Sequence, residues 1–137
     1  FHVSNLIKYK KKLATIDTQD ALIGNRAYDL ASLIDDVRFK SNKKLKDNIY
    51  NYYLKLNDDK VNKVILLNDF EILSVIRNMK IIGIFARLAE RDKKKMYLKL
   101  IPHAWKLIEL RMQNNQIFNG LKRVLNINFP KKIRNHK

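Results

Sequence analysis

Phe1-His2-Val3-Ser4-Asn5-Leu6-Ile7 opens the chain, and Leu13-Ala14-Thr15-Ile16-Asp17 follows a lysine-rich stretch at residues 8–12. Each apolar run is long enough for a short strand, and the polar residues between them predict a reversal. An antiparallel hairpin brings Asn5 and Asp17, which lie twelve positions apart, to the same end of two paired strands. The sequence therefore predicts that these two oxygen-bearing side chains lie close together.

The spacing of Asn5 and Asp17 also matches a phosphotransfer template. In H-R-D-x-x-x-x-N the Asp orients the acceptor hydroxyl, the Asn binds Mg²⁺, and a second metal-binding Asp follows later. On this alignment Asn5 and Asp17 are metal ligands and His2 supports the loop. The catalytic Asp falls just before Phe1, so no catalytic residue is expected within the chain. No initiator Met is present, which predicts the C-terminal part of a longer protein.

Two motifs carry a family resemblance. Residues 1–6 read F-H-V-S-N-L and residues 16–21 read I-D-T-Q-D-A. They resemble the aminoglycoside phosphotransferase and choline kinase superfamily, whose C-lobe carries H-x-D-F-H-x-x-N-L and I-D-F-Q-D-A. Thr18 stands where the family usually has Phe, and Asn25 where Pro or His is commoner, so we expect the packing behind the metal site to differ.

A second set of residues, further along the chain, narrows the resemblance to one group of kinases in this superfamily. Residues 24–33 and 77–88, extended by Arg91-Asp92 and residues 97–102, are similar to bacterial kinases that act on N-acetylmuramate and N-acetylglucosamine in cell-wall recycling. The resemblance covers residues 1–112. It implies a mainly α-helical C-lobe of a protein-kinase-like fold with a small β-hairpin.

The resemblance also implies chemistry and partners. The cofactors would be ATP and Mg²⁺, the acceptor a small sugar or amino alcohol, and the site of action the cytoplasm. A nucleotide-binding N-terminal lobe would complete the cleft, so this chain alone is expected to be inactive. Asp20 would support the metal loop, and Asp29 would anchor the backbone of the catalytic loop. The resemblance identifies no acceptor-binding residue.

Each candidate residue has a simpler structural interpretation. An isolated Asn beside a strand is usually a turn or surface residue, and an isolated Asp after a strand is often a cap. Asp29 lies near the start of an expected helix, where the helix dipole favours a carboxylate. The metal-binding hypothesis for Asn5 and Asp17 therefore depends on the joint pattern and not on either residue alone.

The length and composition favour one compact domain, and the absence of Cys limits its chemistry. The 137 residues are 46% hydrophobic, and the chain contains no Cys, which excludes disulfides and thiolate metal sites. The longest apolar run, Ile81 to Ala86, is far shorter than the ~20 residues of a membrane-spanning helix.

The net charge of +16 raises the possibility of nucleic-acid binding. Residues 1–39 hold six Lys or Arg and five Asp, so +15 belongs to residues 40–137. Because 21 of the 29 basic residues are Lys, the charge favours a solvated surface over Arg-mediated recognition. The alternative function is a catalytically dead, basic helical module that binds nucleic acid or an acidic protein.

The apolar spacing predicts helices over most of the remaining chain. We expect one after Gly24, one capped by Ser41 or Asn42, a short one at Val61–Leu67, and a separate long one from Asp69 to about Glu90. Further helices are expected around Trp105 and Leu121. The predicted organisation is a metal-binding hairpin at residues 1–23, a helical acceptor-binding subdomain at 24–125 and a basic tail at 126–137.

Overall fold

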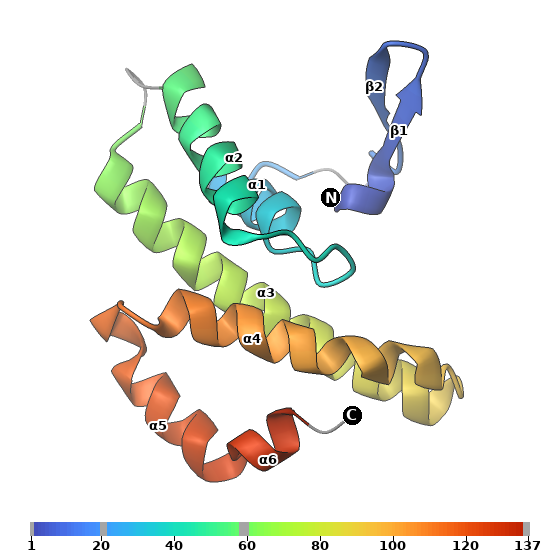
Figure 1. Cartoon of the computed structure of the whole chain (residues 1–137), viewed down its shortest axis with the longest axis vertical. Coiled ribbons are helices and arrows are strands. Elements are labelled where there is room, and N and C mark those ends of the chain that lie inside the picture. Colours follow the sequence, from blue (N-terminus) through green and yellow to red (C-terminus); the bar gives the residue numbers. More distant parts are fainter. Residues whose placement is uncertain (1, 20–21, 58–60, 136–137) are drawn as a thin grey trace. The chain divides into compact units, whose positions relative to one another are not determined.

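The computed structural model describes residues 2–19, 22–57 and 61–135 (Figure 1). The chain is mainly helical and carries one two-stranded antiparallel sheet, which confirms the predicted architecture at this level. It forms two compact units, residues 1–73 and residues 74–137. The first unit holds β1 (Leu6–Tyr9), β2 (Lys12–Thr15), α1 (Ala27–Ile34), α2 (Lys43–Leu56) and the beginning of α3 (Lys63–Arg91).

The hairpin forms where the sequence predicts it. Leu6 pairs with Thr15 and Tyr9 pairs with Lys12, so the reversal occupies only two residues. Lys10 takes a positive φ of 53° in this turn, a conformation that two-residue hairpins favour. Beyond the last ladder pair, the backbone N–H of Ile16 donates to the carbonyl of Asn5 at 2.9 Å. This bond extends the pairing to the position before Asp17.

The first unit has a small apolar core. Ala27, Leu30, Ala31 and Ile34 recur at helical spacing on α1 and are buried with Leu66 and Phe70 of α3. The ring of Tyr50 lies 5.2 Å from that of Phe70, which brings α2 into the same cluster. Asn42 caps α2 by accepting the N–H of Leu45 at 2.8 Å, so the predicted cap is confirmed.

The prediction of two helices at Val61–Leu67 and Asp69–Glu90 is wrong. One uninterrupted helix, α3, covers Lys63–Arg91. The polar pair Asn68-Asp69 lies at the expected break, but these residues lower helix propensity by only a few tenths of a kcal/mol each. Neither Pro nor Gly occurs between Leu67 and Phe70 to end the helix. Apolar residues on both sides of the polar pair keep it helical.

The second unit continues with α4 (Ile101–Met112), α5 (Asn119–Asn128) and α6 (Lys131–Arg134), and short 3-10 segments precede α4 and α5. Pro102 lies in the first turn of α4, where its missing N–H costs no intrahelical hydrogen bond. Trp105 is buried, and its ring lies 5.5 Å from that of Phe129. Among the described residues, no helix is sufficiently long and apolar to cross a membrane.

Residues 126–137 were predicted to be a basic tail, and within them α6 is held by Arg134, which is only 3% exposed. Its guanidinium donates to Glu109 and to Asn126 at 2.8 Å each. It also lies 5.0 Å from the centroid of the Trp105 ring, a cation–π distance. These contacts attach the segment up to Arg134 to α4 and α5.

Candidate metal-binding site

Asn5 ends a 3-10 turn at Val3–Asn5 and begins the hairpin. Its side chain is 6% exposed, which is low for an amide and requires hydrogen-bond partners. Oδ1 accepts the backbone N–H of His2 at 3.1 Å, and Nδ2 donates to Oδ2 of Asp17 at 3.1 Å. The structure therefore brings together the two residues that the sequence singled out as metal ligands.

Asp17 lies just beyond β2 with a positive φ of 61°. Asp tolerates this left-handed conformation better than most residues, and backbone strain of this kind clusters at functional sites. The carboxylate is exposed on its outer side, and its Oδ1 accepts a hydrogen bond from Nε2 of Gln19 at 2.6 Å. Asp17 thus presents a negatively charged group at the open end of the hairpin.

The donor set fits a hard divalent cation. Mg²⁺ takes oxygen ligands, commonly one or two carboxylates from the protein, with phosphate and water oxygens completing an octahedron. Asp17 supplies one carboxylate. Nδ2 of Asn5 faces Asp17, so Asn5 can supply its amide oxygen to a shared cation only when the amide turns over, which exchanges two groups of nearly the same shape and gives up the hydrogen bond with His2. Within the described part of the chain, no group of three His, Cys, Asp or Glu side chains gathers to form a protein-only metal cage.

The three supporting candidates lie in different places. His2 contributes its backbone N–H to the side chain of Asn5, next to the site. Asp29 is exposed in the first turn of α1, where a carboxylate complements the helix dipole. Asp20 lies outside the described residues. Their supporting roles stay predictions.

Asp36 holds the loop that carries Asn5. Oδ2 of this buried carboxylate accepts the backbone N–H of Val3 at 3.0 Å, and Oδ1 accepts that of Arg38 at 2.9 Å. Sequence reasoning assigned an anchoring role to Asp29 and missed Asp36. The available signal was an Asp35-Asp36 pair between Ile34 and Val37, where two carboxylates interrupt an apolar run.

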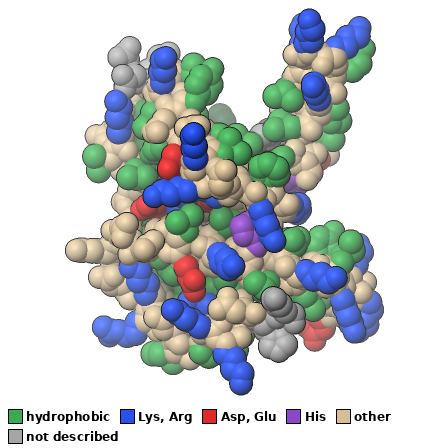
Figure 2. Space-filling view, viewed as in Figure 1, with side chains coloured by type: hydrophobic (Ala, Val, Ile, Leu, Met, Phe, Trp, Pro, Cys, Tyr) green, Lys and Arg blue, Asp and Glu red, His purple; other side chains and the backbone are tan. Residues whose placement is uncertain are grey.

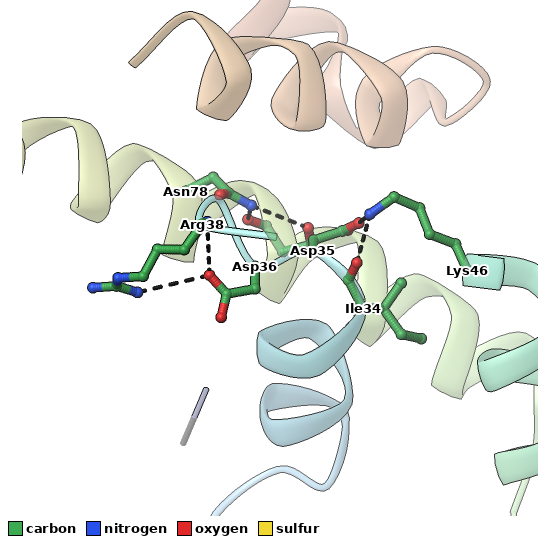
Figure 3. A network of polar contacts seen from close by, with 7 residues as sticks. Ile34, Asp35, Asp36, Arg38, Lys46 and Asn78 are labelled. Carbon is green, nitrogen blue, oxygen red and sulfur yellow. Dashed lines mark hydrogen bonds and ion pairs between the residues drawn. The ribbon is translucent and has the colours of Figure 1, made fainter. Parts of the chain in front are cut away.

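A buried ion pair lies beside this anchor, at the end of α1 (Figure 3). Nζ of Lys46 lies 2.8 Å from Oδ1 of Asp35 and also donates to the carbonyl of Ile34. Asp35 is fully buried and Lys46 is 6% exposed. The lysine therefore neutralises the buried carboxylate and satisfies a carbonyl at the helix terminus, which joins α1 to α2.

The first unit also contains a pocket of about 310 Å³. Gly24, Asn25 and Arg26 form one side of it, and residues from Val61 to Asp69 form the other. Nδ2 of Asn25 donates to Oδ2 of Asp69 at 2.7 Å, so the two sides are bridged by a polar contact. The volume lies near the lower end of the range for small-molecule sites.

The chain is similar to three bacterial kinases. It is 28% identical over 115 residues to an N-acetylmuramate/N-acetylglucosamine kinase of Caulobacter vibrioides. This alignment covers 80% of the present chain and 31% of the Caulobacter protein. It is 34% identical over 107 residues to the protein of the same name from Neisseria meningitidis (74% of this chain, 32% of that one). For the Pseudomonas aeruginosa protein of that name, the identity is 31% over 111 residues, which are 77% of this chain and 32% of that protein.

No protein-family model matches the chain. The chain spans about a third of the length of the curated relatives it matches. The three relatives share one name, and each alignment covers about three quarters or more of the present sequence. The chain is therefore a distant homologue of the N-acetylmuramate/N-acetylglucosamine kinases.

Proposed function

We propose that this chain is the C-terminal part of an ATP- and Mg²⁺-dependent phosphotransferase that phosphorylates an amino sugar of the N-acetylmuramate or N-acetylglucosamine type. The observation that carries the proposal is the 3.1 Å contact between Asn5 and Asp17 in a chain homologous to kinases of this name. The reaction would take place in the cytoplasm as part of cell-wall recycling.

The residues of the chain would divide the work as follows. Asp17 and Asn5 would hold Mg²⁺, which would supply charge stabilisation for the transferred phosphoryl group. His2 and Asp36 keep the turn before Asn5 in place through the two backbone contacts described above. The catalytic Asp precedes Phe1 and the nucleotide lobe lies further upstream. The isolated chain is therefore inactive, because such catalysis depends on positioning by both lobes.

Residues 24–125 would form the acceptor side. The pocket beside Asn25 and Asp69 supports this assignment, because it combines an Asp, two Asn and an Arg with aliphatic side chains. Carboxylate and amide groups can bind sugar hydroxyls, while the aliphatic wall contacts the ring faces. Residues 1–23 would be the metal-binding part, and the basic segment at residues 126–137 would have no role in the reaction.

The test uses a longer protein that contains this chain and the upstream catalytic and nucleotide-binding regions. Phosphorylation of N-acetylmuramate and N-acetylglucosamine is measured for the unmodified protein, Asp17→Ala and the control Asp47→Ala. Asp47 is an exposed carboxylate on α2, so its removal matches the change in charge. We expect Asp17→Ala to lower the rate by about 10²-fold or more, and Asp47→Ala to leave it unchanged.

Two results would refute the proposal. One is turnover by the 137-residue chain itself, since it holds no catalytic Asp on the proposed alignment. The other is an extended protein that binds oligonucleotides tightly at physiological salt and neither sugar nor ATP. The second result would establish the basic binding module instead.

A further inference from the structure

Helix α5 carries apolar side chains on two faces. Phe118 and Leu125 are buried, 5% and 3% exposed, and form the inward side. Val124 is 54% exposed and Ile127 is 73% exposed, so both side chains face solvent. A helix that faces water normally has polar residues on its outer side. The outer side of α5 is therefore not explained by folding of the second unit.

Exposed apolar and basic residues also flank α5. Ile117, 59% exposed, lies in the 3-10 turn Gln116–Phe118 that leads directly into α5. The exposed cation Arg123 lies one turn before Ile127 on α5, and Lys131 begins the next helix, α6, after Pro130. Lys132 is exposed beside Lys131. We call Ile117, Arg123, Val124, Ile127, Lys131 and Lys132 the α5 surface.

The charge around this surface has one sign. Residues 110–137 contain seven Lys or Arg and neither Asp nor Glu. The second unit as a whole holds sixteen basic and three acidic residues, so it accounts for +13 of the net charge of +16. In the view of Figure 2, Lys and Arg side chains lie among hydrophobic ones, and acidic side chains are sparse. A ligand of the α5 surface must therefore be anionic and must also accept aliphatic side chains.

Few partners meet both requirements. A second copy of the chain would place like charges against each other, which costs free energy. Single-stranded nucleic acid supplies phosphates, but its bases stack on aromatic side chains. The most exposed apolar residues here are aliphatic, and the neighbouring aromatic Phe129, 43% exposed, packs on Trp105. A bilayer that contains anionic lipids offers both a negative surface and an apolar interior just beneath it.

We propose that the α5 surface binds reversibly to anionic lipid bilayers, with Val124 and Ile127 entering the interface and Arg123, Lys131 and Lys132 contacting lipid phosphates. This is attachment to one leaflet of the bilayer. Electrostatic attraction and apolar insertion are each weak alone, so binding requires both. The inference stands independently of the kinase proposal.

The test measures co-sedimentation of the 137-residue chain with vesicles. Vesicles of phosphatidylcholine alone are compared with vesicles that contain one third phosphatidylglycerol, at low and at physiological salt. We expect binding only to the anionic vesicles, with affinity falling as salt rises. Removing three cations in Arg123→Gln/Lys131→Gln/Lys132→Gln should weaken binding roughly 10²-fold, because each juxtamembrane cation contributes about fivefold.

A second variant tests the apolar contribution to vesicle binding. Val124→Asn/Ile127→Asn should weaken binding on the order of tenfold, since two interfacial side chains are lost. The matched control is Val64→Asn/Leu67→Asn, which changes two exposed apolar residues of α3 at the same spacing, 78% and 44% exposed. For charge, the control is Lys43→Gln/Lys44→Gln/Lys55→Gln on α2. Both controls should bind like the unmodified chain, and circular dichroism checks that every variant is folded.

Three outcomes with the 137-residue chain, and one with a longer protein, would overturn the proposal. They are equal binding to neutral vesicles, equal loss of binding in the control variants, and tighter binding to a single-stranded oligonucleotide than to anionic vesicles at the same salt. The last outcome would assign the α5 surface to nucleic acid. If vesicle binding is lost only in a longer protein that contains the chain, the surface is covered by another part of that protein and the proposal is wrong.

Discussion

The carboxylate of Asp36 holds the backbone of Val3, thirty-three residues earlier in the chain, through a 3.0 Å hydrogen bond. Asp36 follows α1 and is 1% exposed, whereas Val3 lies in the turn that presents Asn5. The position of the candidate metal ligand therefore depends on a buried residue outside the hairpin. A two-stranded hairpin is marginally stable by itself, so an anchor of this kind is needed to fix its end.

The first prediction concerns this anchor. Asp36→Ala should lower the free energy of unfolding by roughly 1–3 kcal/mol, because it leaves the N–H groups of Val3 and Arg38 without their acceptor. Amide hydrogen exchange at Val3 should accelerate as well. Asp29→Ala, the control at an exposed carboxylate, should cost less than about 1 kcal/mol through the helix dipole. Faster exchange at Val3 in Asp29→Ala but not in Asp36→Ala would return the anchoring role to Asp29.

The second prediction concerns the buried ion pair. Lys46→Met should destabilise the chain by about 3 kcal/mol or more in urea unfolding, because it leaves the carboxylate of Asp35 buried without its cation. Adding Asp35→Asn to Lys46→Met should recover part of this loss, since the amide carries no charge to desolvate. Lys44→Met, at an exposed position of the same helix, should change stability by less than about 0.5 kcal/mol. Equal effects of Lys44→Met and Lys46→Met would contradict this account.

The third prediction concerns the C-terminal segment. Arg134→Gln should cost roughly 2–3 kcal/mol, because the guanidinium makes charge-assisted hydrogen bonds in a buried position. It should also change the fluorescence of Trp105, whose ring faces the guanidinium. Lys132→Gln removes a neighbouring exposed cation and should leave both the stability and the fluorescence unchanged. An Arg134→Gln variant with native fluorescence would mean that α6 does not pack as described.

Local features were predictable from the sequence where one physical rule dominated. The lysine-rich reversal between two apolar runs predicted the hairpin, and the helix cap expected at Ser41 or Asn42 is formed by Asn42. The continuity of α3 through Asn68-Asp69 was missed, because a polar pair weakens a helix without ending it. Asp36 and Lys46 were missed for another reason: their importance comes from contacts 33 and 11 residues away, which no local pattern encodes.

The candidate site, too, was predictable only in part. The closeness of Asn5 and Asp17 followed from strand pairing, and the structure places them 3.1 Å apart. Their role as metal ligands rests on the family resemblance and stays a prediction.

The folding of α6 onto α4 was not expected, because the basic composition of residues 126–137 suggested a tail. The buried guanidinium of Arg134 has no distinguishing signal in the sequence.

The central claim is that Asp17 and Asn5 hold the divalent cation that accompanies the nucleotide. Binding of Mn²⁺, used in place of Mg²⁺, can be followed by electron paramagnetic resonance in the extended protein with ATP present. We expect Asp17→Ala to weaken Mn²⁺ binding strongly, Asn5→Ala to weaken it less because only a neutral oxygen is lost, and Asp47→Ala to bind normally. Unchanged Mn²⁺ affinity in Asp17→Ala would contradict the account.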